Sequence, residues 1–172
     1  VWEAPRKANG CTSAPHHIAH LFDIAAPDLP RFQQLGVTAN LQGAWSSDAP
    51  PVEYFPRVGH DHHPAERLYP FGQLERAGAP LCAGSDWPVS TADPLAAAAA
   101  VTARTDYAAP LHTDDLENLD LASFFTAYTA GSAYVNGRSD RTGRLSEGYL
   151  ADLVPLSGEP FDGATVAEVF VD

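Results

Sequence analysis

Short apolar segments that alternate with helix-like patterns organise most of the chain. Each apolar run is short and bounded by turn residues, which is typical of buried strands. The three predicted strands are residues 16–22, 37–42 and 79–83. Periodic patterns with start and stop signals, such as Gly36 after a helix and Asp93-Pro94 before one, predict helices. The predicted helices are residues 27–35, 65–77, 93–104 and 121–134. This alternation predicts parallel strands joined by right-handed crossovers.

The two ends of the chain have a different pattern. Residues 1–15 carry small and polar side chains and predict a loop. Residues 142–154 predict a turn-rich approach to an extended strand, and residues 164–171 predict a final strand. We therefore expect a small β unit beside the α/β part.

The expected fold class is α/β, with about three βα units. A complete (β/α)₈ barrel needs about 250 residues, and this chain has 172. If the units belong to a TIM barrel, more than half of that barrel is absent. We expect a barrel portion over residues 1–140 and part of a small β-sandwich over residues 141–172.

Composition narrows the classes of partner. The formal net charge is −12, so nucleic acids and anionic membrane surfaces are not expected partners. No apolar run approaches the ~20 residues that span a bilayer. Cys11 and Cys82 form no disulfide framework, which favours a reducing, cytoplasmic location. The start at Val1 has no signal-peptide pattern and suggests a chain cut from something longer.

Candidate chemistry lies where the predicted strands end. The strand at residues 79–83 stops at Gly84-Ser85-Asp86, and the first strand ends near His20. Alternate strands of a barrel direct their end residues into one mouth, where an imidazole and a carboxylate suit a divalent metal such as Zn²⁺. The carboxylate could also take a proton from water that the ion acidifies. Alternatively, His20 is a hydrogen-bonded core residue and Asp86 is a turn or helix-capping residue.

The long connection over residues 43–64 offers a second location for chemistry. It contains His60-Asp61-His62-His63, whose spacing matches neither a helical His-x-x-x-His site nor a zinc finger. The alternative to an enzyme is thus a non-enzymatic protein that binds a metal or a partner through this loop. A third possibility is an oligomerising fragment, since three βα units leave sheet edges and helix faces uncovered.

Ordered motifs along the chain carry a family resemblance. From about residue 17 to residue 151 the sequence resembles the amidohydrolase superfamily, in the branch of metal-dependent hydrolases that includes N-substituted formamide deformylase. The similar pieces are His17-Ile18-Ala19-His20, residues 28–37, Asn40-Leu41-Gln42 with Trp45, Glu66-Arg67 with Tyr69-Pro70, Gly84-Ser85-Asp86-Trp87-Pro88-Val89, Ala127-Tyr128-Thr129, and residues 143–154.

The resemblance implies site roles for individual residues. His20 would be the metal-binding histidine after the sixth barrel strand. Asp86 would be the aspartate after the eighth, which binds the metal and assists proton transfer. The implied substrate-lining residues are Gln42, Trp45, Arg67 and Trp87.

The resemblance also implies an activity and its incompleteness. The expected reaction is metal-dependent hydrolysis of a non-peptide C–N bond in a small amide, formamide or cyclic amide, with one or two divalent ions, most simply Zn²⁺. The family's His-x-His and its fourth- and fifth-strand ligands have no counterpart here. We therefore expect that this chain alone is inactive, and that its partner is the missing N-terminal part of the barrel or a second copy.

Overall fold

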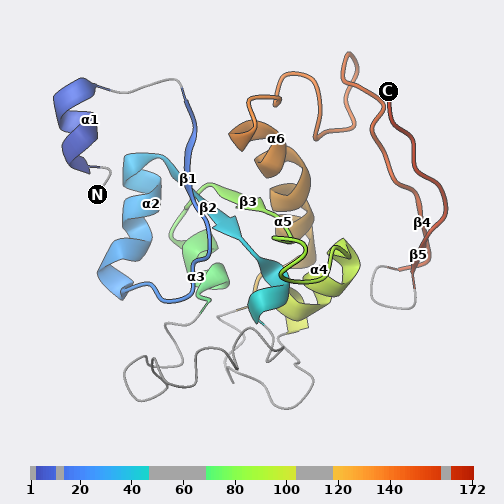
Figure 1. Ribbon diagram of the computed structural model, residues 1–172, viewed down its shortest axis with the longest axis horizontal. Helices are drawn as coiled ribbons and strands as arrows, with labels where there is room; N and C mark the ends of the chain where they lie inside the picture. Colours follow the sequence, from blue (N-terminus) through green and yellow to red (C-terminus); the bar gives the residue numbers. More distant parts are fainter. Residues whose placement is uncertain (1–2, 11–13, 47–68, 104–117, 160–163) are drawn as a thin grey trace.

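A three-stranded parallel sheet forms the centre of the computed structural model, which describes residues 3–10, 14–46, 69–103, 118–159 and 164–172 (Figure 1). The strands are β1 (His16–Ile18), β2 (Val37–Leu41) and β3 (Leu81–Ala83), in that spatial order. Ile18 pairs with Ala39, and Ala39 pairs with Leu81 on the other side of β2. The predicted parallel α/β arrangement is confirmed, although β1 and β3 are shorter than predicted.

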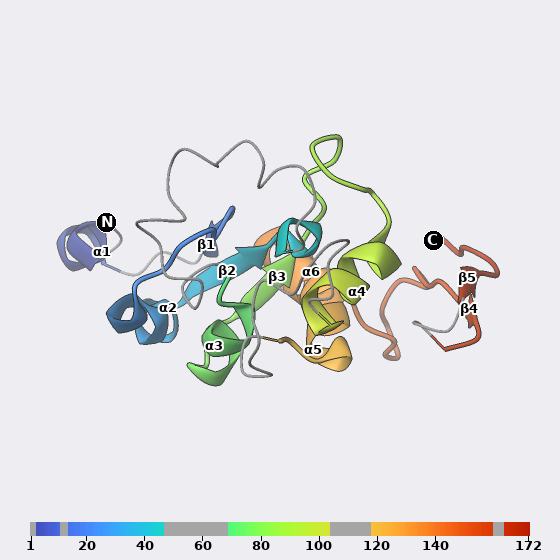
Figure 2. The ribbon, with the colours of Figure 1, turned by 90° about the horizontal axis from the view of Figure 1, so that it is seen from below.

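Helices connect the strands, although Tyr69 and Pro70, inside the helix predicted over residues 65–77, are not helical, and residues 65–68 lie outside the described ones. The elements between strands are η1 (Ala26–Asp28), α2 (Leu29–Leu35), η2 (Gly43–Ser46) and α3 (Phe71–Arg76). Helix α2 ends at Gly36, whose φ of 56° is the left-handed conformation that favours glycine at this position. Helices α2 and α3 contact each other and lie on the same side of the strands (Figure 2).

After β3 the chain forms α4 (Pro94–Ala103) and then a second helical run. Asp93 caps α4 by accepting a hydrogen bond from the Leu95 amide at 2.8 Å. The second run consists of α5 (Leu121–Thr126), a π-helical turn η5 (Ala127–Gly131) and α6 (Ser132–Val135). The predicted helix over residues 121–134 is therefore one helical run with a π turn inside it.

The π turn packs directly against β3. A Cβ atom at Gly131 would lie 2.1 Å from the carbonyl oxygen of Leu81, so only glycine fits there. The Ser132 hydroxyl donates a hydrogen bond to the carbonyl of Ala83 at 2.6 Å. Backbone contact between this helical run and β3 thus fixes the strand that leads to Asp86.

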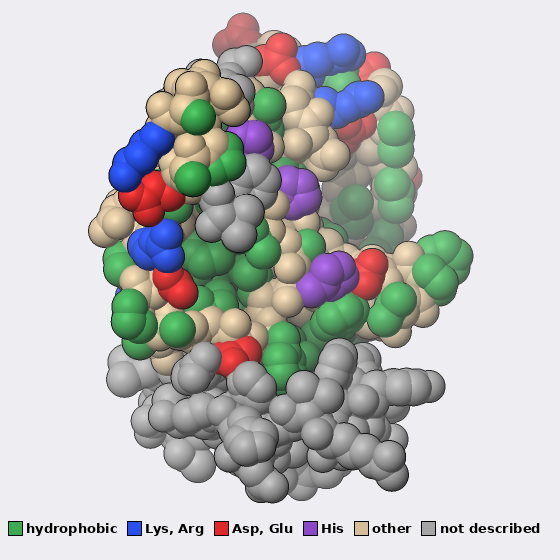
Figure 3. Space-filling view, turned by 60° about the vertical axis from the view of Figure 1, so that its left-hand side comes forward, with side chains coloured by type: hydrophobic (Ala, Val, Ile, Leu, Met, Phe, Trp, Pro, Cys, Tyr) green, Lys and Arg blue, Asp and Glu red, His purple; other side chains and the backbone are tan. Residues whose placement is uncertain are grey.

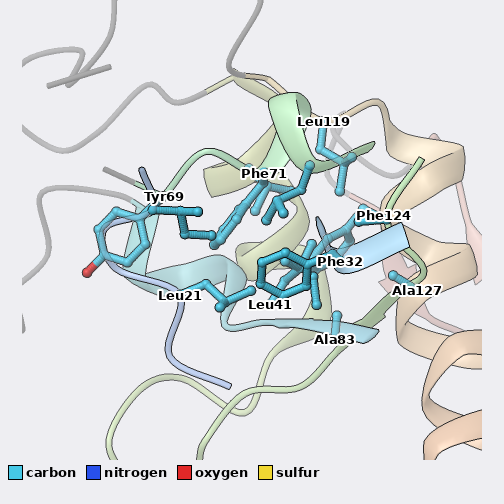
Figure 4. Packing of buried hydrophobic residues seen from close by; sticks show 14 of the residues in the cluster. Leu21, Phe32, Leu41, Tyr69, Phe71, Ala83, Leu119, Phe124 and Ala127 are labelled. Atoms are coloured by element: carbon cyan, nitrogen blue, oxygen red, sulfur yellow. The ribbon is translucent and has the colours of Figure 1, made fainter. Parts of the chain in front are cut away.

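The hydrophobic core lies between the sheet and the helices (Figure 4). Leu41, Leu74 and Phe124 are fully buried. The last helical run packs its aromatic side chains on this core, with Phe124 inside it and Phe125 and Tyr128 partly buried against it.

The N-terminal region corrects one prediction. The expected loop over residues 1–15 contains a helix, α1 (Glu3–Asn9), which lies beside α2 (Figure 1). Glu3 forms an i,i+4 ion pair with Lys7 at 3.0 Å and contacts Arg31 of α2 at 3.5 Å. An acidic first turn and a basic last turn favour the helix, and Pro5 lies early enough to be tolerated.

The C-terminal segment forms a small two-stranded ribbon. Strands β4 (Leu156–Ser157) and β5 (Thr165–Val166) are antiparallel, and an isolated bridge joins Leu153 to Phe170. The ribbon is much shorter than the strand predicted over residues 164–171. In the described ranges, no further strand joins it, and the expected β-sandwich is seen only to this extent. No helix within those ranges has the length and apolarity to cross a bilayer.

Candidate metal and catalytic site

His20 and Asp86 meet at the carboxyl edge of the sheet. His20 follows β1 and Asp86 follows β3, and the two are separated by the intervening strand β2. Nδ1 of His20 lies 3.9 Å from Oδ2 of Asp86, and the two side chains are 51% and 37% exposed. Figure 3 shows histidine side chains (purple) exposed on one face of the molecule. The structure thus brings together the two residues that the sequence singled out.

Both residues have an unusual backbone conformation. The φ angles are 57° for His20 and 54° for Asp86, in the left-handed region. Residues other than glycine enter this region at a cost of roughly 1–2 kcal/mol, although Asp and His tolerate it better than most. Strained conformations of this kind concentrate at functional sites. Two such residues in contact at one sheet edge therefore favour a functional site there.

Contacts from Gln42, directly after β2, and from η2 hold His20. Its backbone N–H donates a hydrogen bond to Oε1 of Gln42 at 2.7 Å. Its ring lies 4.9 Å from the ring of Trp45, between ring centres, at a tilt of 32°. These contacts orient the imidazole from the side of the neighbouring strand.

Short-range contacts hold Asp86. The Val89 amide donates a hydrogen bond to the Asp86 carbonyl at 2.8 Å, and the Trp87 amide donates one to the Ser85 hydroxyl at 3.2 Å. The Ser90 hydroxyl closes the same turn by donating a hydrogen bond to the Ser85 carbonyl. The turn leaves Trp87 69% exposed next to Asp86.

The pair fits two positions of a divalent-metal site. Zn²⁺ accepts histidine nitrogen and carboxylate oxygen at about 2.0–2.2 Å, so two such atoms on a tetrahedral ion lie about 3.4 Å apart. The observed separation is 3.9 Å, and a shift of about half an ångström by two partly exposed side chains would bring both atoms to one ion. Among the described residues, no group of three or more His, Cys, Asp or Glu side chains could hold a metal. A complete ligand set therefore needs donors beyond the described residues.

Two other polar groups near β3 are poorly suited to chemistry at neutral pH. Burial raises the pKa of the Cys82 thiol to about 12, so the thiol is neither a nucleophile nor a ready ligand. Burial also raises the pKa of Tyr128, although a hydrogen bond with Ser85 opposes the shift. Neither group is therefore a candidate for the chemistry beside His20.

The structure places the remaining predicted residues in different surroundings. Trp45 is half-buried and Trp87 is exposed, both next to the His20–Asp86 pair. Gln42 is 5% exposed, and its side chain faces His20 and Asn40 rather than solvent. Arg67 and the loop His60–His63 lie outside the described residues.

Sequence reasoning assigned no site role to Asn40 and His17, which connect to the site through Gln42. Nε2 of Gln42 donates a hydrogen bond to Oδ1 of Asn40 at 3.0 Å. Nδ2 of Asn40 lies 3.1 Å from Nδ1 of His17. Polar residues two positions apart on the predicted strand over residues 37–42 were a usable signal, because alternate strand residues share a face.

An apolar groove of about 400 Å³ lies elsewhere, between β1 and α2. Its lining includes Ile18, Phe32 and Val37, with Asp28 and Arg31 also present. Neither His20 nor Asp86 is among its lining residues. The groove is therefore separate from the candidate site.

Comparisons with known proteins identify the family of the chain. The amidohydrolase family profile matches residues 1–168. Protein LONG AFTER FAR-RED 3 of Arabidopsis thaliana is 29% identical over 167 residues, which covers 94% of this chain and 27% of the relative. N-substituted formamide deformylase of Arthrobacter pascens is 32% identical over 100 residues, or 58% of this chain and 18% of the relative.

A solved structure supports the fold assignment. The crystal structure of an uncharacterized metal-dependent hydrolase from Pyrococcus horikoshii OT3 is 28% identical with a TM-score of 0.64, and the match covers 78% of this chain and 27% of that one. The chain thus spans about a quarter of the length of such relatives, and its fold is of the TIM-barrel α/β type. By the profile match over nearly its whole length, the chain belongs to the amidohydrolase family.

Proposed function

We propose that this chain supplies part of the catalytic site of a metal-dependent hydrolase that cleaves a non-peptide C–N bond in a small amide, formamide or cyclic amide. The observation that carries the proposal is the contact between His20 and Asp86, 3.9 Å apart at the sheet edge. Family membership supports a hydrolase, and similarity to a protein named as a formamide deformylase supports the bond class. A metal-dependent hydrolase among the similar structures supports a divalent ion.

His20 and Asp86 would have different roles in the reaction. His20 and Asp86 would hold the ion, with Zn²⁺ as the simplest choice. When bound, such an ion polarises a carbonyl and acidifies water. Asp86 would accept the proton of the attacking water and return it to the leaving nitrogen as general base and then general acid.

The two tryptophans would form the substrate-facing part of the site. Trp87 exposes 69% of its surface next to Asp86, and Trp45 lies against His20. Their faces would contact the apolar substituent of a small amide, which is how aromatic side chains usually line small-molecule sites. Arg67 would complete this lining, as the family resemblance implies.

The site as described offers only two donors, and hydrolytic zinc sites generally have three protein ligands. We propose that the remaining ligands come from an N-terminal part of the barrel or from a second copy of the chain. The 172-residue chain by itself would then bind metal weakly and show no useful turnover.

The test is Asp86→Asn in the complete enzyme, assayed on N-substituted formamides and cyclic amides. Asn tolerates the left-handed conformation, so the fold and the thermal midpoint should not change. Turnover should fall about 10²–10⁴-fold, the usual contribution of a general base. Asp140→Asn, an exposed acid far along the chain, is the matched control and should leave turnover unchanged. Near-wild-type turnover from Asp86→Asn would remove Asp86 from the mechanism.

A Zn²⁺ titration tests the metal's location separately. His20→Ala should weaken binding, whereas His62→Ala with His63→Ala should not. The opposite result would assign the metal to the loop His60–His63 and would favour a non-enzymatic binding protein.

A further inference from the structure

The His20 turn is held by Gln42, which directly follows the neighbouring strand β2, and by the Phe22 amide, which donates a hydrogen bond to the His20 carbonyl at 2.8 Å. The β1–β2 pairing ends at Ile18, so the backbone of His20 lies beyond the last ladder pair. Its N–H donates a hydrogen bond instead to Oε1 of Gln42, at 2.7 Å. A side-chain carbonyl thus takes the place of a strand partner where the chain turns out of the sheet.

Gln42 is itself fixed at both ends of its amide. It is 5% exposed, and a buried amide that lost its partners would be costly. Its Nε2 donates a hydrogen bond to Oδ1 of Asn40 at 3.0 Å, and Nδ2 of Asn40 lies 3.1 Å from Nδ1 of His17. The hydrogen-bonded chain runs from β1 to β2 and back to the residue after β1.

This chain of amides fixes both the position of Gln42 and the direction of its carbonyl. Because Nε2 is bound to Asn40, Oε1 must point the other way, toward His20. The amide is therefore oriented before any ligand arrives. Second partners that orient metal-binding histidines commonly change metal affinity about 10–100-fold when removed.

We propose that Gln42 is a positioning residue. Its carboxamide, aligned by Asn40, holds the His20 backbone in the left-handed conformation that directs the imidazole toward Asp86. This inference rests on the proposed function, in which His20 binds the metal. It gives Gln42 a role different from the substrate contact that the family resemblance implied, because both ends of the amide are occupied within the protein.

The experiment measures two properties of the full chain. Amide hydrogen exchange at His20 reports the hydrogen bond without any metal, and titration with Zn²⁺ alone reports the affinity. In Gln42→Leu, which lacks the acceptor, exchange at His20 should be about tenfold faster, as expected for losing one hydrogen bond. The Zn²⁺ affinity should fall about 10–100-fold. Gln42→Glu keeps an acceptor for the His20 amide but loses the donor to Asn40, so exchange at His20 should accelerate less than in Gln42→Leu.

Thr38→Val is the matched control. Thr38 lies on the same strand and is 1% exposed, and its hydroxyl has no hydrogen-bond partner among the described residues. The valine variant should leave both measurements unchanged. If Gln42→Leu does not fold, Asn40→Ala, at a partly exposed position, gives the milder test, and both properties should shift in the same direction by a smaller factor.

The outcomes separate this inference from the proposed function. Slow exchange at His20 in the leucine variant would overturn the positioning role. Fast exchange with unchanged Zn²⁺ affinity would also overturn it, because the turn would then not control metal binding. If the wild-type chain binds no Zn²⁺ at all, the metal role of His20 fails, and exchange alone decides whether Gln42 holds the turn.

Discussion

The turns after β1 and β3 bring His20 and Asp86 together at the carboxyl edge of the sheet, but different contacts hold the two turns. His20 has a bond within its own turn, from the Phe22 amide to the His20 carbonyl, and depends further on Gln42, which lies 22 residues away in sequence, directly after β2. Asp86 depends on bonds within its own turn, from Val89 to Asp86 and from Ser90 to Ser85. The first turn thus depends on a side chain that follows β2, whereas the second is linked to β2 through the backbone, by the hydrogen bond from the Gly84 amide to the Leu41 carbonyl at 3.0 Å.

The difference shows which parts of the fold fix the positions of His20 and Asp86. The position of the turn after β3 depends on the position of β3 itself. Gly131 packs against β3 and Ser132 donates a hydrogen bond to it, and both contacts fix the strand. A turn held by a neighbouring strand needs that strand in register, and β2 is paired on both sides. The Asp86 turn should lose its position when the helical run that contains Gly131 is displaced from β3. The His20 turn should lose its position when Gln42 is substituted.

The largest expected effect comes from Gly131→Ala. The new Cβ would lie 2.1 Å from the Leu81 carbonyl oxygen and 3.0 Å from Cα of Cys82. Neither atom belongs to a flexible side chain, so the helix must move away from β3. We expect the free energy of unfolding to fall by about 3 kcal/mol, measured by urea denaturation.

Gly84→Ala is the control for this substitution. Gly84 follows β3 directly, and an added Cβ there would meet no heavy atom within 4 Å. The free energy of unfolding of Gly84→Ala should differ from that of the wild type by less than about 0.5 kcal/mol. Equal stability of the two alanine variants would mean that the helical run does not support β3.

A smaller effect is expected at the N-terminus of that helical run. The carboxylate of Asp120 accepts hydrogen bonds from the Ser123 amide at 2.9 Å and from the Ser123 hydroxyl at 2.7 Å. Asp120→Ala should lower the free energy of unfolding by about 1 kcal/mol, as is usual for loss of an N-cap. Asp28, at the start of α2, makes no capping bond with its side chain and instead pairs with Arg31. A partly exposed ion pair usually contributes less than about 1 kcal/mol, so Asp28→Ala should cost less.

The same carboxylate makes a pH prediction. The hydrogen bonds from Ser123, first from its hydroxyl and then from its amide, lower the pKa of Asp120 below the ordinary 3.8. The stabilisation is therefore complete above the unfolded-state pKa and is lost as the pH falls through the lowered value. The stability difference between wild type and Asp120→Ala should be constant near neutral pH and shrink in acid. A difference that grows in acid would contradict the capping role.

Features that depend on neighbours in sequence could be predicted from the sequence. The Gly84-Ser85-Asp86 turn, the Gly36 helix stop and the Asp93 cap are each encoded within a few residues, and the structure contains all three. The parallel order of the strands also followed from the alternating pattern.

Features that depend on tertiary contacts could not be predicted in this way. The link from His17 through Asn40 and Gln42 to His20 exists only because β1 and β2 pair in one particular register. The π turn follows from the close approach of Gly131 to β3. Helix α1 is supported partly by a contact between Glu3 and Arg31, 28 residues apart.

The smallest expected effect compares His20 and Asp86, two of the residues with a left-handed backbone, directly. Glycine relieves a left-handed φ but adds freedom to the unfolded chain, and these two effects, each roughly 1 kcal/mol, nearly cancel. Asp86→Gly should therefore leave the free energy of unfolding within about 0.5 kcal/mol of wild type. His20→Gly also loses the contact with Trp45, and should be less stable than Asp86→Gly by about 0.5 kcal/mol.

Denaturation in the presence of a chelator measures the stability of both variants without a contribution from bound metal. If Asp86→Gly unfolds far more readily than His20→Gly, the aspartate serves the fold of its turn. If it keeps full stability while catalysis is lost, the carboxylate is present for the chemistry at the sheet edge.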